Sequence, residues 1–320
     1  MKTNRLPPFI EDFGFLITLA FAQDGRVFLS ERITGRLRQI YEEEYHLIKT
    51  FPIVPLFGHH ETGLLGIVLD PDFSQNGYIY CYYTYGSSVK DFKNKVVKIR
   101  ENGTSEQTLL ENIPSGLIHN GGIMAFAPDK TLYIGVGIDN DRKRESQNIN
   151  FLGGKILRIN RDGSIPHDNP FPNSPVYSYG HRNIFGLAFH PITGKLYISD
   201  VGPDANDEIN IVEKSGNYGW PEVMGMSDDP RFINPIKTYT PIITPTQNAF
   251  ANNQLYFGSF NEGSVHRLTL KGENYDQVVN DEIIYRGQTF GVVGVFISPE
   301  NLFYVTTPSS INQFYPQSFA

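Results

Sequence analysis

Hydrophobic and polar positions follow a pattern that recurs six times along the chain. Each copy holds a short apolar segment, a turn rich in Pro, Asp, Gly or Asn, and a second segment of aromatic and β-branched residues. The first copy, for example, is FLITLAFAQDGRVFLSE at residues 15–31. Two such segments around a turn predict a β-hairpin. The six predicted turns lie at Asp24, Asp72, Asp129, Gly194, Asn252 and Glu300.

The spacing of these turns indicates a repeat architecture. Consecutive turn positions are 48, 57, 65, 58 and 48 residues apart, and several copies continue into a third strand such as GKILRINRDG at residues 154–163. A hairpin with at least one further strand, repeated about every 50 residues, is typical of β-propeller blades. We therefore predict an all-β fold, a six-bladed β-propeller of four-stranded antiparallel blades, with residues 1–320 as a single domain. The alternative is a β-sandwich followed by a small second domain.

Composition narrows the possible functions. Apolar residues make up 40% and charged residues 19% of the 320 positions, which excludes disorder and allows a large core. The net charge of −7, without a basic run, makes nucleic acid an improbable main ligand. Cys81 is the only cysteine, so neither an intramolecular disulfide nor a thiolate metal cluster is possible. No stretch approaches 18 consecutive apolar residues, and we predict no transmembrane helix.

The N-terminal region has no clear secretion signal. Residues 13–22, FGFLITLAFA, have the length of a signal-peptide core, but Glu11 and Asp12 precede them and no A-x-A site follows. We expect a cytoplasmic protein as the sequence is written, and a periplasmic or secreted one if a leader was removed. The sequence predicts no particular oligomeric state, because no long exposed apolar segment indicates an interface.

Polar stretches between the hairpins hold the candidate chemistry. They are GHHETGLLG at 58–66, LIHNGG at 117–122, SYGHRNIFG at 178–186 and DVGPDANDE at 200–208. In the first three, polar groups adjoin glycines just before an innermost strand, and in a propeller these positions converge near the central channel. We predict that Glu61, His119, Arg182 and Asn183 meet there. A carboxylate, an imidazole, a fixed cation and an amide suit base-assisted chemistry on a polar substrate.

Each of these residues also has a structural interpretation. His119 before Asn-Gly-Gly is compatible with a turn residue, and Arg182 with a buried ion-pair partner. His59 and His60 next to Glu61 resemble a metal cluster. Adjacent histidines in a strand point to opposite faces, however, and this weakens the interpretation as a metal site.

Taken together, the motifs resemble the soluble glucose/sorbosone dehydrogenases, which are aldose sugar dehydrogenases that use pyrroloquinoline quinone (PQQ). The similarity covers essentially the whole chain and is strongest between residues 118 and 221. It is carried by HNGGIMAFAPDKTLYIGVG, GGKILRINRDGSIPHDNPF, YSYGHRNIFGLAFHPITGKLYISD, and GPDANDEINIV with SGNYGWP. The resemblance implies a six-bladed propeller.

The resemblance also implies roles for the matching residues. His119 would be the general base that takes the proton of the anomeric hydroxyl, while a hydride passes from that carbon to the quinone and the aldose leaves as its lactone. Arg182 and Asn183 would contact the quinone oxygens, and Glu61 would contact substrate or cofactor. The acid that orients the base in the family is replaced here by Ile138.

Calcium is implied in two places. The carbonyls of Gly202 and Pro203 would hold the Ca²⁺ of the cofactor, and Glu208 with the carbonyl of Tyr218 would hold a second, structural Ca²⁺. The implied partners are a small aldose and an electron acceptor.

The last two blades depart from the family. Asn261 stands where a Lys is expected, and Gly291 and Val293 stand where two arginines are expected. PQQ carries three carboxylates, and hydrogen bonds to charged groups contribute about 1.5–3 kcal/mol each. Losing these cations would weaken PQQ binding considerably. Arg286 and Lys271 are the candidates to replace them.

Three functions remain compatible with these residues. The first is PQQ- and calcium-dependent oxidation of an aldose. The second is a cofactor-less propeller that binds a carbohydrate or a protein, as the lost cations suggest. The third is a lactonase-type hydrolase with a channel metal, for which Glu61 and Asp207 are the candidate carboxylates. A cation that lines the central cavity would favour the first.

Overall fold

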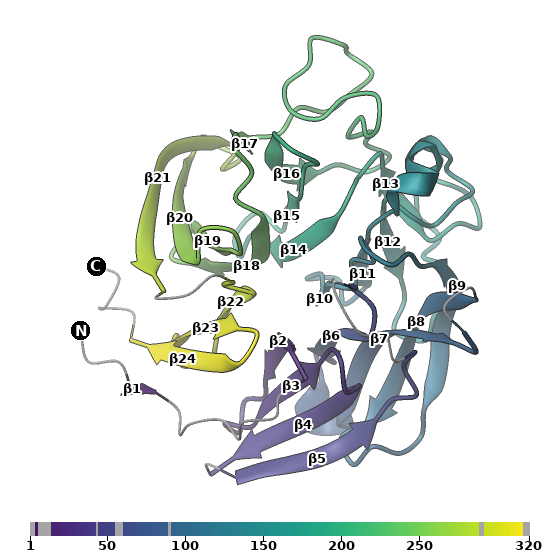
Figure 1. Ribbon diagram of the computed structural model, residues 1–320, viewed down its shortest axis with the longest axis vertical. Helices are drawn as coiled ribbons and strands as arrows, with labels where there is room; N and C mark the ends of the chain where they lie inside the picture. The colour runs from purple at the N-terminus through teal and green to yellow at the C-terminus, as the bar shows by residue number, and fades with distance from the viewer. Residues whose placement is uncertain are drawn as a thin grey trace.

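The computed structural model describes residues 4–5, 14–42, 44–54, 60–88, 91–287 and 291–315. Its strands are arranged in sheets around a ring (Figure 1). Within these residues, the only helices are a single turn, α1 (Phe73–Asn76), and a 3₁₀ helix, η1 (Asn140–Gln147). Neither of these two helices is long and apolar enough to span a membrane. The predicted all-β propeller fold is confirmed.

The first four blades are separate four-stranded antiparallel sheets, each in chain order from the innermost strand outward. Blade 1 comprises β2 (Leu16–Phe21), β3 (Val27–Glu31), β4 (Arg36–Tyr41) and β5 (Glu44–Thr50). Blade 2 comprises β6 (Leu64–Leu69), β7 (Tyr78–Gly86), β8 (Phe92–Arg100) and β9 (Gln107–Pro114). Blade 3 comprises β10 (Met124–Phe126), β11 (Leu132–Val136), β12 (Lys155–Ile159) and β13 (Val176–Tyr179). Blade 4 comprises β14 (Ile184–Phe189), β15 (Leu196–Asp200), β16 (Asp207–Val212) and β17 (Lys237–Tyr239).

The remaining strands form one eight-stranded sheet in the order β1-β24-β23-β22-β18-β19-β20-β21. They are β1 (Asn4–Arg5), β18 (Pro245–Ala251), β19 (Gln254–Ser259), β20 (Ser264–Lys271), β21 (Gln277–Arg286), β22 (Gly294–Ile297), β23 (Phe303–Thr307) and β24 (Ser310–Phe314). One parallel residue pair, Gln247 with Gly294, joins β18 to β22. The lack of a side chain at Gly294 permits this approach, since a Cβ there would lie 3.0 Å from the Cβ of Gln247. The prediction of six four-stranded blades therefore differs from the structure, because the described residues form four separate blades and one eight-stranded sheet.

The six predicted hairpins are all present. Each predicted turn lies between two antiparallel strands, as Asp24 does between β2 and β3 and Gly194 between β14 and β15. The connection after Asp72 differs from a simple turn, because it contains α1.

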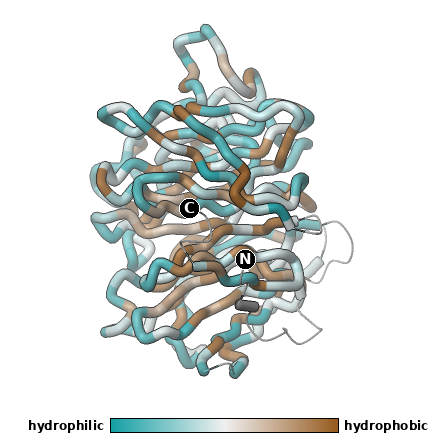
Figure 2. Tube along the Cα trace, turned by 90° about the vertical axis from the view of Figure 1, so that its left-hand side faces the viewer, coloured by the Kyte–Doolittle hydropathy of each residue, from teal (hydrophilic) through white to brown (hydrophobic). Residues whose placement is uncertain are grey.

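Apolar side chains fill the spaces between neighbouring blades. In β7, for example, Ile79 and Tyr83 pack in a cluster shared with blade 1, whereas Tyr80 and Tyr82 pack in a cluster shared with blade 3. Successive side chains of a strand point to opposite faces, so a strand between two blades is buried on both. This explains the unbroken run YIYCYY. Figure 2 shows short hydrophobic stretches alternating with hydrophilic ones along the chain.

Candidate active site

A cavity of about 540 Å³ lies at the end of the central channel where the innermost strands begin. Its volume falls within the range of small-molecule sites, about 300–1,000 Å³. The structure brings to its wall four residues that the sequence predicted to converge, Glu61, His119, Arg182 and Asn183. Gly202 lines the same cavity.

Irregularities in the inner strands direct three apolar side chains and one threonine toward this cavity. The strand register shifts by one residue near the start of β2, β6 and β14, and a similar irregularity occurs in β18. The residues at these shifts, Ile17, Leu65, Phe185 and Thr246, all line the cavity. A bulge re-aims a side chain that regular pleating would direct elsewhere. The same local device therefore shapes the cavity from four places around the ring.

His119 presents a neutral imidazole to the cavity. The residue adopts a left-handed conformation with a φ of 60°, and its ring Nδ1 lies 3.2 Å from the carbonyl oxygen of Ile138. A carbonyl only accepts, so Nδ1 carries the proton and Nε2 keeps its lone pair. No hydrogen bond within the described residues engages Nε2. Burial and the charge of Arg182 lower the pKa of His119 to about 4.

Glu61 connects the loops before β6 and β10. Its Oε2 accepts a hydrogen bond from the backbone nitrogen of His119 at 2.5 Å, and its backbone carbonyl accepts one from Nδ2 of Asn120 at 3.0 Å. Burial raises the pKa of the Glu61 carboxyl, although the His119 N–H and the charges of Arg32 and Arg182 oppose this shift.

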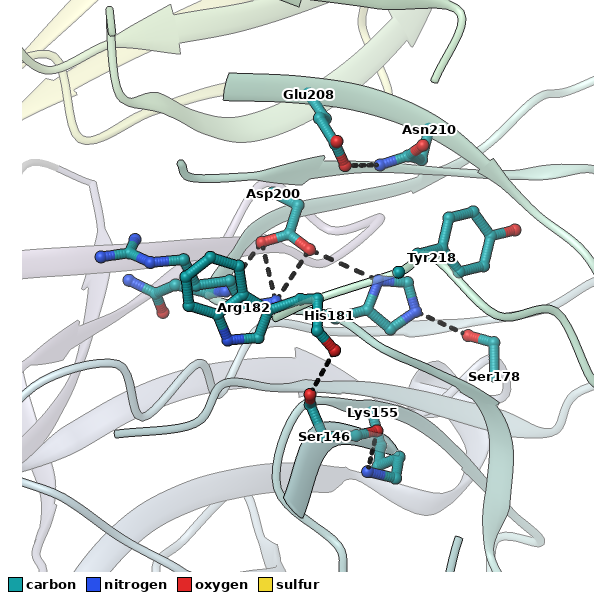
Figure 3. A network of polar contacts seen from close by, with 12 residues as sticks. Ser146, Lys155, Ser178, His181, Arg182, Asp200, Glu208, Asn210 and Tyr218 are labelled. Atoms are coloured by element: carbon teal, nitrogen blue, oxygen red, sulfur yellow. Dashed lines mark hydrogen bonds and ion pairs between the residues drawn. The ribbon is translucent and has the colours of Figure 1, made fainter. Parts of the chain in front are cut away.

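Asp200, at the end of β15, positions the site residues Arg182 and Asn183 (Figure 3). Its carboxylate accepts the backbone N–H of Arg182 at 3.0 Å and that of Asn183 at 2.7 Å. The Arg182 guanidinium in turn donates from Nη1 to the carbonyls of Val201 at 2.7 Å and Gly202 at 3.0 Å. These bonds fix the direction of the guanidinium at the cavity wall.

Lys155 lies behind this wall and is connected to Arg182 through Ser146 and Trp220 (Figure 3). The Arg182 guanidinium lies 5.4 Å from the centre of the Trp220 ring, and the Trp220 carbonyl accepts a hydrogen bond from Oγ of Ser146 in η1. Lys155 is fully buried, and burial lowers its pKa to about 7. Its ammonium donates at 2.7–3.1 Å to three carbonyls, those of Glu145, Ser146 and Gly153.

The residues predicted to hold calcium are not all in the cavity. Gly202 lines it, but its carbonyl accepts from Arg182, and Pro203 is exposed outside the lining. Glu208 is 2% exposed behind the site, where Oε2 accepts a hydrogen bond from Nδ2 of Asn210 at 2.9 Å. Burial and the charge of Asp200 raise the pKa of Glu208 to about 8.

Tyr218 lies in the same buried region as Glu208 (Figure 3). Its ring stacks on that of His181 with centroids 4.5 Å apart, and its hydroxyl donates to the carbonyl of Ile211 at 2.6 Å. The described residues contain no group of three or more His, Cys, Asp or Glu side chains placed to hold a metal ion. His59 lies outside the described residues, so the interpretation of His59, His60 and Glu61 as a metal site is not tested here.

The late blades supply no cation to the cavity within the described residues. Val293 lines the cavity. Asn261 is not a lining residue, and its Nδ2 donates a hydrogen bond of 3.3 Å to the carbonyl of Ile242. Neither of the predicted replacements, Arg286 and Lys271, is a lining residue.

The structure supplies a cation that the sequence analysis missed. Arg32, the residue directly after β3, lines the cavity from blade 1. A charged residue directly after a fully buried strand, in the loop next to an inner-strand start, is the signal that could have identified it.

Asp207 does not act at the cavity. Its Oδ1 accepts the backbone N–H of Gly202 at 2.8 Å, and its Oδ2 accepts those of Ile243 and Thr244, both at 2.7 Å. Both carboxylate oxygens therefore hold loop backbone. This arrangement disfavours the hydrolase that would pair Asp207 with Glu61.

Comparisons with known proteins agree on one family. The sequence profile of glucose/sorbosone dehydrogenases matches residues 15–315. Quinoprotein glucose dehydrogenase B of Acinetobacter calcoaceticus is 35% identical over 246 residues, which cover 66% of this chain and 51% of that protein. A putative oxidoreductase (glucose dehydrogenase) of Thermus thermophilus superposes with a TM-score of 0.88, at 32% identity and 98% coverage of both chains. The PQQ-bound aldose sugar dehydrogenase of Streptomyces coelicolor gives a TM-score of 0.85 at 29% identity, covering 98% of this chain and 97% of that one.

Proposed function

The chain belongs to the glucose/sorbosone dehydrogenase family, and from this premise we propose that it is an oxidoreductase that converts an aldose to its lactone with PQQ as cofactor. The observation that carries the proposal is the neutral imidazole of His119 beside the Arg182 guanidinium in one cavity. A base with a free nitrogen and a fixed cation are the two groups that oxidation of a sugar hydroxyl requires of the protein.

The cavity residues fit a polar, flat ligand such as PQQ. Three buried polar atoms at the wall have no hydrogen-bond partner within the described residues, namely Nε of Arg32, Nε of Arg182 and Oδ1 of Asn183. Buried polar groups are normally paired, so these atoms are suited to a ligand that fills the cavity. Arg182 and Asn183 would hold its quinone edge. When bound, PQQ supplies the acceptor for the hydride of the sugar C1–H bond.

The chain's own residues account for the proton and the charge. Nε2 of His119 takes the proton of the anomeric hydroxyl while the C1–H bond breaks with its electron pair and the C1–O bond becomes a carbonyl. The hydride thus carries away two electrons and one proton, and the second proton stays on His119. Arg182 stabilises the negative charge that develops next to it.

Of the two predicted calcium places, Glu208 offers more support for a calcium proposal than Gly202 and Pro203 do. At the Gly202 and Pro203 carbonyls the fit is poor, because the Arg182 guanidinium already holds the Gly202 oxygen. At Glu208 a buried carboxylate lies beside Asn210, whose Oδ1 is buried and has no partner among the described residues. We therefore propose a structural Ca²⁺ at Glu208, with the Tyr218 carbonyl as a further ligand.

A second candidate function is carbohydrate binding without redox chemistry. It is favoured by the uncharged Val293, which lines the cavity at a position where the resemblance implies a cation. In this case the chain binds sugars but not PQQ.

One experiment separates the two functions. We expect PQQ to bind in titration calorimetry, and the loaded protein to reduce an artificial dye when an aldose is added. His119→Ala should still bind PQQ but lose dye reduction. No detectable PQQ binding at high concentration would refute the dehydrogenase, and sugar binding by the same chain would then establish the second function.

We also infer that the ring has six blades and that residues 1–320 form one domain. The eight-stranded sheet divides at the single Gln247–Gly294 pair into two sets of four strands, β18–β21 and β22–β24 with β1. Each set has the antiparallel order of the four separate blades.

A further inference from the structure

We propose that Arg32 binds a carboxylate of the ligand in the cavity, so that blade 1 supplies a positive charge that the last blades lack. Blades 1 and 4, which carry Arg32 and Arg182, lie on opposite sides of the ring (Figure 1). The inference relies on the proposed function only for the choice of ligands in its test.

Arg32 is held rigidly between blades 1 and 2. Its backbone N–H donates to the carbonyl of Phe15 at 2.9 Å, and its own carbonyl accepts from the N–H of Leu64 at 3.1 Å. The guanidinium lies 4.2 Å from the centre of the Phe15 ring and donates from Nη1 to the carbonyl of His60 at 2.7 Å. A ligand therefore meets a positive group whose position is already fixed.

The charge of Arg32 has no carboxylate partner. Within the described residues no carboxylate oxygen lies within 4.0 Å of its guanidinium, and the adjacent Glu31 pairs with Arg38. Burial lowers the pKa of Arg32, and the charge of Glu61 opposes this shift without forming an ion pair. A partly buried cation without a carboxylate partner is costly to the fold, and a ligand that supplies the opposite charge would remove this cost.

The charges at the cavity wall add up in the same direction. The lining residues include two guanidinium groups and one carboxylate, Arg32, Arg182 and Glu61, with His119 neutral. With Glu61 ionised, these three side chains carry a net charge of +1, and with Glu61 protonated they carry +2. The cavity therefore favours an anionic ligand, and we expect a carboxylate of that ligand to face Arg32 in blade 1. Such a carboxylate is carried either by the cofactor or by an acidic aldose, such as a uronic acid.

The first arm of the test measures cofactor binding. Calorimetric titration compares PQQ with its trimethyl ester for the wild-type chain, Arg32→Gln and Arg32→Lys. Arg36→Gln is the matched control, since Arg36 lies in the same blade but does not line the cavity. We expect Arg32→Gln to weaken PQQ binding about 10- to 100-fold and ester binding far less, with Arg32→Lys in between. Circular dichroism of each variant checks the fold.

The second arm measures sugar binding. Calorimetry compares D-glucuronate with D-glucose, with and without PQQ. If the carboxylate comes from the substrate, Arg32→Gln abolishes the preference for glucuronate and leaves PQQ binding unchanged. The inference is overturned if no carboxylate ligand binds the wild-type chain, or if Arg32→Gln binds all of them as tightly as the wild type does. Absence of aldose oxidation by a chain that binds PQQ through Arg32 would instead refute only the proposed function.

Should Arg32→Gln fail to fold, the wild-type chain and Arg32→Lys still decide the question. Affinity for the carboxylate ligand, but not for its neutral counterpart, should fall as salt concentration rises. Equal salt dependence of both ligands contradicts the proposal.

Discussion

The carboxylate of Glu61 accepts a hydrogen bond from the backbone nitrogen of His119 at 2.5 Å. A residue of the loop before β6 thereby sets the position of the base that precedes β10. Glu61→Gln keeps an acceptor oxygen for this bond, whereas Glu61→Ala leaves the buried N–H without a partner.

We therefore expect Glu61→Ala to lower the free energy of unfolding by about 1–3 kcal/mol and Glu61→Gln to lower it much less.

Glu61→Gln also removes a negative charge near Arg32 and Arg182. It should therefore strengthen PQQ binding about tenfold, or ~1.4 kcal/mol, at alkaline pH. Denaturant titrations and calorimetry measure the two effects. Equal stability loss in both variants would show that the hydrogen bond is not what matters.

The pH dependence of turnover tests the state of His119. Its pKa is lowered to about 4, so the imidazole stays neutral and able to accept a proton down to that pH. We expect the acidic limb of kcat/KM for aldose oxidation to fall near pH 4 rather than near 6.5. His119→Gln should reduce kcat about 10²- to 10⁴-fold while PQQ binding persists. An acidic limb at pH 6–7 that disappears in this variant would contradict the assigned environment.

Lys155 makes the stability depend on pH in a defined direction. Its pKa in the folded chain is about 7, against 10.5 as the ordinary value, so between these pH values the unfolded chain binds the extra proton. Stability from this group therefore rises with pH over that window, by up to about 1.4 kcal/mol per pH unit. Lys155→Met should lose this rise relative to the wild type in denaturant titrations at pH 7, 8, 9 and 10. Parallel curves for the two proteins would refute the prediction.

Calcium should act through Glu208. Its pKa is raised to about 8, so the folded chain holds a proton that the unfolded chain releases near 4.5, and stability from this group falls as pH rises from 4.5 to 8. A bound Ca²⁺ would offset this loss by pairing with the ionised carboxylate. We expect 5 mM Ca²⁺ to raise the Tm of the wild-type chain at pH 8, as RT ln(1 + [L]/Kd) requires, and not that of Glu208→Gln. An unchanged Tm for the wild type would refute this site.

The fold was largely predictable from sequence because its unit is local. The hairpins around Asp24 and Gly194 are defined by neighbouring residues, and repetition of the unit indicates the propeller. The joining of the last eight strands into one sheet was not predictable, since it depends on one backbone pairing between Gln247 and Gly294, 47 residues apart.

The candidate site was predictable only in part. Glu61, His119, Arg182 and Asn183 lie within three residues of a glycine in polar loops, which made them visible. The carbonyl that orients His119 belongs to Ile138, and a backbone group leaves no trace in residue type. Arg32 was missed for another reason: its partners are carbonyls and a ring from other loops, which only the closed ring brings together.

The bulged residues Ile17, Leu65, Phe185 and Thr246 have a consequence for engineering. Each reaches the cavity from a different inner strand. Ile17, Leu65 and Phe185 each occupy a one-residue register slip, whereas Thr246 lies in a longer irregularity between Pro245 and Asn248. Varying the four side chains would reshape the cavity wall without disturbing the residues that hold the base or the guanidinium groups. A combinatorial library at these positions is therefore a compact way to redirect this scaffold toward sugars of different size.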